Sequence, residues 1–287
     1  MSKTNHPAKK DMPVQYDSNP FTLTFNALGR FFNTNVNWAI VIIAFVLIGF
    51  IGQTAVELLR LMYPDQPTGQ SSEITPLTTG ASPDATVVIA VIVVIFSLLL
   101  VFAILATIFS AFINGMFSYV ALQSEAGKTI GFSEAFNATK KRFWRLLFAQ
   151  LLANLKIFGW TLLFIIPGIV AGYRYQLLPY LIMNESDKEK GIGDSHNKTK
   201  ALVKGRLWEL FGISFVAGIV PFVGSLLSIS GNAAYYNQLQ ATAHEPEKRP
   251  KIHWLNYIGL ILGATVLLFA FLILVLIILV ALAVSGK

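Results

Sequence analysis

The chain of 287 residues is 54% hydrophobic and 13% charged, whereas a soluble domain carries about 25% charged residues; this excludes an ordinary soluble protein and indicates a membrane protein. The absence of cysteine excludes disulfides, thiolate metal sites and cysteine nucleophiles. A net charge of +7 favours the basic cytoplasmic loops of a polytopic membrane protein over nucleic-acid binding.

The chain begins with a polar stretch and a short amphipathic segment. Residues 1–20 are predicted to be a disordered cytoplasmic arm, because they lack the apolar side chains that a packed core needs. Residues 21–32 predict an amphipathic helix at the membrane interface. Its apolar face carries four side chains: Phe21, Phe25, Leu28 and Phe32. Residues 38–59 form the first predicted membrane span, with Trp38 at the boundary where amphipathic rings settle.

A loop and a second apolar run follow. Residues 61–84 are rich in Pro, Gly, Ser and Thr and contain no Lys or Arg. Residues 85–123 are apolar and long enough to span a membrane with considerable tilt. Residues 131–142 are amphipathic again, so we expect them to lead from the interface into the central apolar stretch.

The central stretch, residues 143–183, predicts two apolar helices joined without a polar loop. The first limb, residues 143–165, is long enough to cross about 30 Å of hydrocarbon. Pro167 cannot continue a helix, and Gly168 can adopt the backbone angles of a reversal. The pattern therefore predicts a hairpin whose turn is formed by Pro167 and Gly168, with residues 169–183 returning to the starting side.

The last third of the chain alternates charged and apolar segments. Residues 184–206 are the most charged part of the sequence and predict a cytoplasmic loop. Residues 207–240 are apolar but broken at Pro221, which predicts a hairpin with short limbs that either crosses fully or re-enters. Residues 254–284 predict one further transmembrane helix.

The distribution of positive charge predicts the orientation. All but four of the 22 lysines and arginines fall in the N-terminal arm and in three loops assigned to one side; those four are Arg60, Lys156, Arg174 and Lys287. Cytoplasmic loops carry the excess of Lys and Arg, so the N-terminus is predicted to be cytoplasmic and residues 61–84 external. We expect a multi-pass protein of the cell inner or plasma membrane.

A short pattern recurs along the chain. Residues 21–27 (FTLTFNA) resemble residues 132–138 (FSEAFNA), and residues 197–200 carry a fainter copy. Each copy precedes a predicted hairpin, which indicates a membrane domain of residues 21–240 followed by an additional helix at residues 254–284. The repeated units are residues 21–123, 131–183 and 193–240. The expected fold is therefore an all-α polytopic membrane protein with about six to seven transmembrane helices.

Three motifs carry a resemblance to a known family: Ile166-Pro167-Gly168, Tyr173-Arg174 with Pro179, and Thr199-x-x-Leu202-Val203-Lys204-Gly205-Arg206-Leu207-Trp208. Over roughly residues 21–240 the chain resembles the membrane domain attached to some bacterial glycerophosphodiester phosphodiesterases, which related stand-alone membrane proteins share. The resemblance implies six spans in a bacterial plasma membrane. It implies no catalysis, because the phosphodiesterase activity belongs to a separate barrel domain. Residues 254–284 depart from the six-span pattern.

Two cations within the central hairpin are candidate site residues. A charge on an isolated span costs about 2.5–3.5 kcal/mol on insertion scales, so Lys156 and Arg174 need a reason to be there. One hypothesis is a cationic pocket for a phosphate-bearing lipid headgroup or another anion, assisted by Asn154 and Tyr173. In the alternative, Lys156 extends to the interface and Arg174 pairs with Glu57 or with carbonyls of the hairpin.

No arrangement of residues typical of catalysis is found in the sequence. The four histidines are scattered, which predicts no metal site. Glu57 is placed for an i,i+3 pair with Arg60, and Glu209 is expected at the interface. The sequence therefore predicts a non-enzymatic membrane protein that binds membrane lipids or anions, without a cofactor and without a nucleic-acid partner. The alternative is a small-molecule transporter or a subunit of one.

Overall fold

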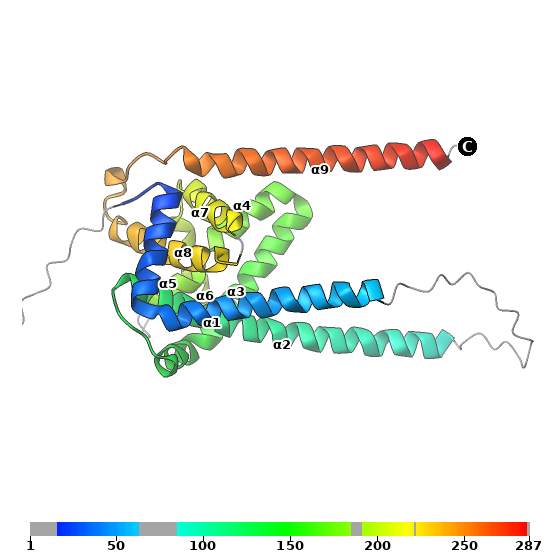
Figure 1. Cartoon of the computed structure of the whole chain (residues 1–287), viewed down its shortest axis with the longest axis horizontal. Coiled ribbons are helices and arrows are strands. Elements are labelled where there is room, and N and C mark those ends of the chain that lie inside the picture. The colour runs from blue at the N-terminus through cyan, green and yellow to red at the C-terminus, as the bar shows by residue number, and fades with distance from the viewer. Residues whose placement is uncertain (1–15, 63–84, 185–190, 221, 286–287) are drawn as a thin grey trace, which may run out of the picture.

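The computed structural model describes residues 16–62, 85–184, 191–220 and 222–285, and within these ranges every regular element is a helix. Figure 1 shows a body of packed helices from which long helices project in one direction. Among the described residues, three helices are long and apolar enough to cross a membrane: α1 (Pro20–Met62), α2 (Ala85–Glu125) and α3 (Phe132–Leu163). The chain is therefore an α-helical membrane protein.

Helix α1 joins the predicted interfacial helix to the first predicted span through a kink. Asn35 has non-helical backbone angles (φ −135°, ψ 45°), and the helix changes direction in the body before it projects (Figure 1). The Asn35 side chain stabilises the kink: its Nδ2 donates to Ser124 Oγ at 2.7 Å, and its Oδ1 accepts from the Ile130 N–H at 2.7 Å. These hydrogen bonds hold the kink of α1 against the end of α2 and the segment that follows it.

The buried face of α1 is separate from the apolar face that is predicted for the membrane interface. Leu23, Ala27 and Phe31 are buried, whereas Phe25 is 47% exposed and Phe32 is also exposed. Helix α8 packs against the side of α1 that carries Leu23, Ala27 and Phe31, and this leaves the apolar face predicted for the membrane interface free of that contact. The exposed rings are left for the membrane interface.

The reversal after α3 lies earlier than predicted. Phe164, with φ −154° and ψ 134°, ends α3 and precedes α4 (Ile165–Tyr175). Pro167 stands in the first turn of α4, where its missing N–H removes no helical hydrogen bond. A Cβ on Gly168 would lie 2.2 Å from Thr161 Oγ1, so this glycine permits the close contact of α3 and α4. Pro167 and Gly168 therefore follow the turn at Phe164 and do not form it.

The predicted return limb, residues 169–183, is broken. Helix α4 ends at Tyr175, and α5 (Leu178–Asn184) begins after a short turn around Gln176. At 1.5 Å per residue the 11 residues of α4 extend about 16 Å, so α4 alone is too short to cross a bilayer. The chain then continues into α6 (Ile192–Leu202), a helix inside the predicted charged loop.

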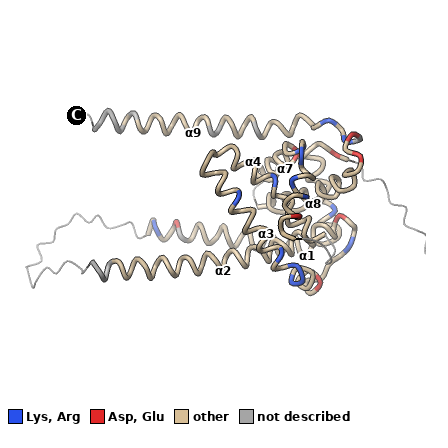
Figure 2. The backbone as a smooth tube through the Cα atoms, turned by 180° about the vertical axis from the view of Figure 1, so that it is seen from behind, with Lys and Arg blue, Asp and Glu red and all other residues tan. Residues whose placement is uncertain are grey.

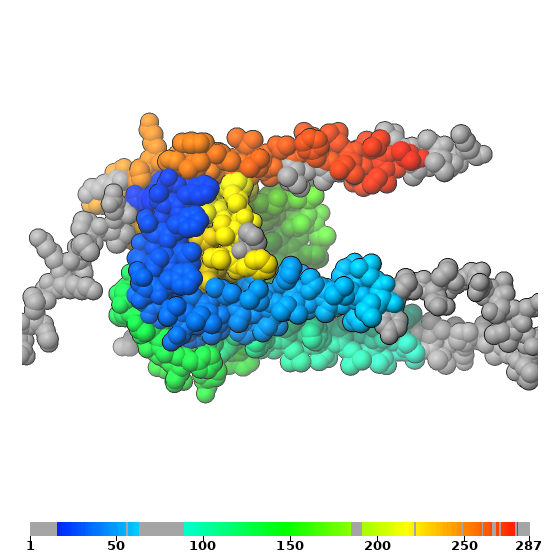
Figure 3. All heavy atoms as spheres, viewed as in Figure 1, coloured from blue at the N-terminus to red at the C-terminus, as the bar shows by residue number. Residues whose placement is uncertain are grey.

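The last two apolar segments form helices close to their predicted positions. Helices α7 (Leu207–Ile219) and α8 (Gly224–Ala241) meet at the predicted break, where Phe222 has a left-handed φ of 64° and Pro221 lies outside the described residues. After the short 3₁₀ helix η1 (Pro246–Lys248), helix α9 (Leu255–Ser285) extends over 31 residues. Figure 3 shows the far lengths of α1 and α9 standing apart.

Charge and apolar surface separate along the long axis. Figure 2 shows Lys, Arg, Asp and Glu gathered mainly at the body end, while the projecting lengths of α2 and α9 carry none of them. Apolar side chains on these lengths are exposed, such as Phe96 and Phe102 on α2. Contiguous exposed apolar surface of this extent is what lipid covers in a membrane protein. Residues 63–84, the predicted external loop, lie outside the described residues.

Candidate functional site

The structure gives Lys156 a partner that lies far away in the sequence. Its Nζ lies 2.9 Å from His196 Nδ1 of α6, and His196 Nε2 lies 2.9 Å from the carbonyl oxygen of Ala149. Because a carbonyl can only accept, Nε2 carries the proton and Nδ1 accepts from the ammonium group. Lys156 is therefore bound to a neutral, buried imidazole on α6.

A second ammonium group lies close to the same cluster. Lys156 Nζ lies 5.8 Å and Lys200 Nζ 5.7 Å from the centroid of the Tyr175 ring, within the range of cation–π attraction. Burial lowers the pKa of His196, and the positive charges of Lys156 and Lys200 lower it further. Both effects keep the imidazole neutral and able to accept the hydrogen bond from Lys156.

The other candidate residues are spread over different surfaces. Arg174 is exposed in the last turn of α4 and makes no ion pair within the described residues. The predicted i,i+3 pair is confirmed, since Arg60 Nη1 lies 3.4 Å from Glu57 Oε2, and no ion pair joins Glu57 to Arg174 among the described residues. Neither Lys156 nor Arg174 lines the two cavities described next.

Asn154 lines a polar cavity of about 410 Å³ between α2, α3, α4, α5 and α8, which we call the polar hollow. Nine residues with amide or hydroxyl side chains contribute to its wall: Ser110, Asn114, Gln150, Asn154, Tyr175, Gln176, Tyr180, Ser228 and Asn232. No Asp, Glu, Lys, Arg or His is among the described residues that line it. The hollow is therefore polar and carries no formal charge on its wall.

The break between α4 and α5 directs Gln176 toward this hollow. Gln176 Nε2 donates to Ser214 Oγ at 3.2 Å and to Asn232 Oδ1 at 3.1 Å. By contrast, Gln150 Nε2 is buried and has no hydrogen-bond partner among the described residues. A buried donor left without a partner costs about 1–3 kcal/mol, and because Gln150 Nε2 has almost no accessible surface, it faces packed atoms and not the open space of the hollow.

An apolar groove of about 400 Å³ continues from the polar hollow along α3 and α4. It is lined by seven residues: Ile157, Thr161, Gly168, Ile169, Gly172, Tyr173 and Gln176. Ile157, Gly172 and Gln176 line both spaces, so the polar hollow and the apolar groove are contiguous. Of the predicted site residues, Asn154 belongs to the hollow and Tyr173 to the groove.

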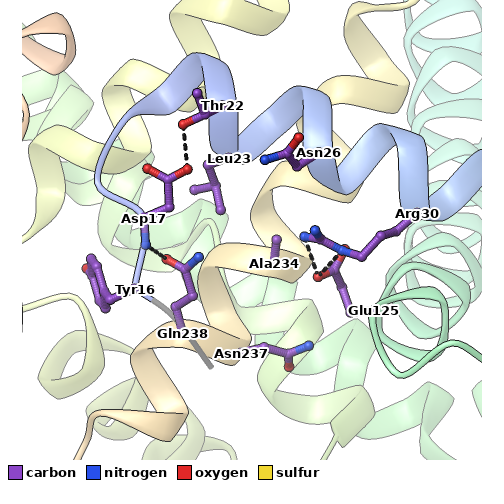
Figure 4. A pocket seen from close by; sticks show the side chains of 10 residues that line it. All are labelled: Tyr16, Asp17, Thr22, Leu23, Asn26, Arg30, Glu125, Ala234, Asn237 and Gln238. Carbon is purple, nitrogen blue, oxygen red and sulfur yellow. Dashed lines mark hydrogen bonds and ion pairs between the residues drawn. The ribbon is translucent and has the colours of Figure 1, made fainter. Parts of the chain in front are cut away.

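A third cavity, of about 660 Å³, lies among the first turns of α1, the end of α2 and α8, and is shown in Figure 4. Arg30 Nη2 pairs with Glu125 Oε2 at 2.8 Å on one side of it. On the other side, Asp17 accepts a hydrogen bond from the Thr22 hydroxyl. Arg30 and Glu125 thus pair with each other, and the Asp17 carboxylate already accepts a hydrogen bond from a neighbouring side chain.

Glu209 was expected at the interface but is 2% exposed. Its Oε2 accepts from the hydroxyls of Tyr16 at 2.7 Å and Tyr235 at 2.8 Å, and its Oε1 accepts from Arg206 Nη1 at 3.1 Å. Burial and the Glu209 charge raise the pKa of Tyr16, so this phenol stays protonated and remains a donor. The network holds the chain just before α1.

This attachment corrects the predicted N-terminal arm. Disorder was expected through residue 20, but Ser18 Oγ accepts from the His253 N–H at 2.7 Å, and the Asn256 side chain donates to the Ser18 carbonyl oxygen at 2.8 Å. Residues 16–19 are therefore fixed against the segment that leads into α9. Residues 1–15 lie outside the described residues.

Among the described residues, no group of three or more His, Cys, Asp or Glu side chains could hold a metal ion. The polar hollow with its apolar groove is the arrangement best suited to bind a ligand. Comparison with protein-family models, with curated proteins and with solved structures finds no match for this chain.

Proposed function

We propose that this chain is a non-enzymatic, multi-pass membrane protein that binds one lipid-like amphiphile. The polar part of the ligand occupies the polar hollow, and its hydrocarbon chain lies in the apolar groove. The observation that carries this proposal is the continuity of the two spaces through Ile157, Gly172 and Gln176. An amphiphile needs both environments side by side, because polar groups lose free energy in hydrocarbon and apolar chains lose it in water.

The exposure of polar side chains at membrane depth supports the same proposal. Asn154 lies about 14 Å along α3 from Leu163, and Asn114 about 16 Å along α2 from Glu125. Both are exposed, and neither forms a hydrogen bond with another described residue. Amide groups in hydrocarbon are costly without partners, so these side chains are suited to hold a polar group that lipid tails do not supply.

We infer an orientation with the charged body end in the cytoplasm of a bacterial cell. The gathering of charge at that end supports this, as does the absence of charged residues from the projecting lengths of α2 and α9. The chain is proposed to cross the inner or plasma membrane about six to seven times, as three repeats plus α9. We also propose that residues 21–240 are related to the membrane domain that is attached to some bacterial glycerophosphodiester phosphodiesterases.

The alternative function is transport of a small molecule. It is favoured by the polar side chains that five separate elements direct into one cavity, and by the broken limb at Gln176, since transporters bind substrates among discontinuous helices. The two functions differ in what happens to the bound ligand. A transporter reconstituted into vesicles moves its ligand across the bilayer, whereas a binding protein retains it.

The test of the proposed function is native mass spectrometry of the purified protein with a variant that blocks the groove. A Cβ on either Gly172 or Gly159 meets no atom within 4 Å, but only Gly172 lines the two spaces. Gly172→Leu should reduce bound lipid by at least about tenfold, which corresponds to 1.4 kcal/mol. Gly159→Leu, the matched control, should retain it. Equal lipid content in both variants would contradict lipid binding in this groove.

A further inference from the structure

The wall of the polar hollow offers hydrogen-bond donors and acceptors in balance. The side chains of Asn114 and Asn154 form no hydrogen bond with another described residue, so each presents an amide NH₂ and a carbonyl oxygen. Gln150 also lines the hollow, but its Nε2 is buried among packed atoms and is not offered to a ligand. Exchanging the nitrogen and oxygen of the Asn114 or the Asn154 amide leaves the balance unchanged. The wall therefore suits a partner that both donates and accepts.

The absence of formal charge on the wall also favours an uncharged ligand group. The lining contains amides and hydroxyls and, among the described residues, no ionised side chain. A phosphate or carboxylate can only accept hydrogen bonds, so it would face the amide oxygens of Asn114 and Asn154 without a cation in contact. A cationic group would face the amide NH₂ groups and find no carboxylate. An uncharged group meets neither penalty.

The nearest ammonium groups are engaged beyond the wall. Lys156 and Lys200 lie near the ring of Tyr175, which itself lines the hollow, and Lys156 also donates to His196. Neither lysine lines the hollow. An anion inside would therefore accept no hydrogen bond from either ammonium group.

From this balance we infer that the ligand's polar part is uncharged and carries several hydroxyl groups, as in a glycosyl or glycerol headgroup. A hydroxyl both donates and accepts, so neighbouring hydroxyls match the paired groups of amide side chains. This inference rests on the proposed function, because it specifies the headgroup of the amphiphile bound there. It differs from the anionic headgroup expected for a pocket built from Lys156 and Arg174.

The experiment compares two lipids with identical acyl chains in the full-length protein. Glucosyl diacylglycerol presents uncharged hydroxyls, and phosphatidic acid presents a phosphate. After delipidation, each lipid is titrated and its occupancy is measured by native mass spectrometry. We expect glucosyl diacylglycerol to bind at least about tenfold more tightly. Asn114→Leu and Asn154→Leu should each weaken it about 3- to 10-fold, the effect of one lost hydrogen bond.

The matched control is Gln53→Leu, which changes the same amide on an exposed position of α1 away from both spaces. It should leave the binding of both lipids unchanged. Asn114 and Asn154 are exposed, and neither forms a hydrogen bond with another described residue, so the delipidated Asn114→Leu and Asn154→Leu variants should be at least as stable as the parent protein. A loss of binding in these variants therefore reports on recognition and not on folding.

The outcomes separate the two proposals. Tighter or equal binding of phosphatidic acid, abolished by Gly172→Leu, would overturn the uncharged headgroup while leaving lipid binding in the groove intact. Preference for glucosyl diacylglycerol that Asn114→Leu and Asn154→Leu both leave unchanged would also overturn it, because these amides would then not be the groups that bind the hydroxyls. Binding of neither lipid, or insensitivity of both to Gly172→Leu, would refute the proposed function itself.

Discussion

Two glycines one turn apart on α4 should respond to the same substitution in opposite directions. A Cβ on Gly168 would lie 2.2 Å from Thr161 Oγ1 and 2.8 Å from Thr161 Cα. Carbon atoms pack at about 3.5–4.0 Å, so Gly168→Ala must push α4 away from α3 by about 0.7 Å or more. Overpacking of this kind costs about 1–3 kcal/mol. A Cβ on Gly172 meets no atom within 4 Å, and Gly172→Ala should stabilise the helix by about 0.5–1 kcal/mol.

Thermal denaturation of the two variants in the same detergent tests this expectation. The melting temperature of Gly168→Ala should fall below that of the parent protein, and that of Gly172→Ala should equal or exceed it. Adding Thr161→Ala to Gly168→Ala should restore only part of the loss, because the Thr161 Cα stays in place. If Gly168→Ala melts at or above Gly172→Ala, then α3 and α4 are not in the close contact on which the groove depends.

Three further outcomes are expected. Glu209→Ala should destabilise the fold by about 3–5 kcal/mol, because it strands a buried partner cation; an unchanged thermal melt would refute the Glu209 network. The pKa of His196 is lowered in the folded state, so stability should be full above pH 6.5 and decline below it, and a decline that persists undiminished in His196→Gln would exclude this imidazole as its source. On intact cells an impermeant thiol reagent should label Ser71→Cys and spare Asn197→Cys, with the reverse pattern contradicting the orientation; Asn197 is exposed, so the reagent would reach a cysteine there if that side were external.

The sequence by itself determined the class of the protein and the course of its helices. Long apolar runs require helices in a membrane, because the backbone must satisfy its own hydrogen bonds there. The breaks near Pro167 and Pro221 and the clustering of charge were also visible, because they depend on local chemistry. The Gln150–Asn154 spacing on α3, an i,i+4 pair of amides in an apolar run, was present in the sequence as well and could have indicated the polar hollow.

The tertiary structure alone decided which of these residues meet. Lys156 binds His196, 40 residues away, and the hollow gathers Asn114, Gln150 and Asn232 from three different helices. Arg174, placed with Lys156 by sequence reasoning, is exposed and makes no ion pair among the described residues. Hydropathy and helical period describe each segment separately, whereas a site depends on how the helices rotate and approach one another. The rotation and separation of the helices follow from packing between different segments of the chain, such as the contact of α3 and α4 that Gly168 permits.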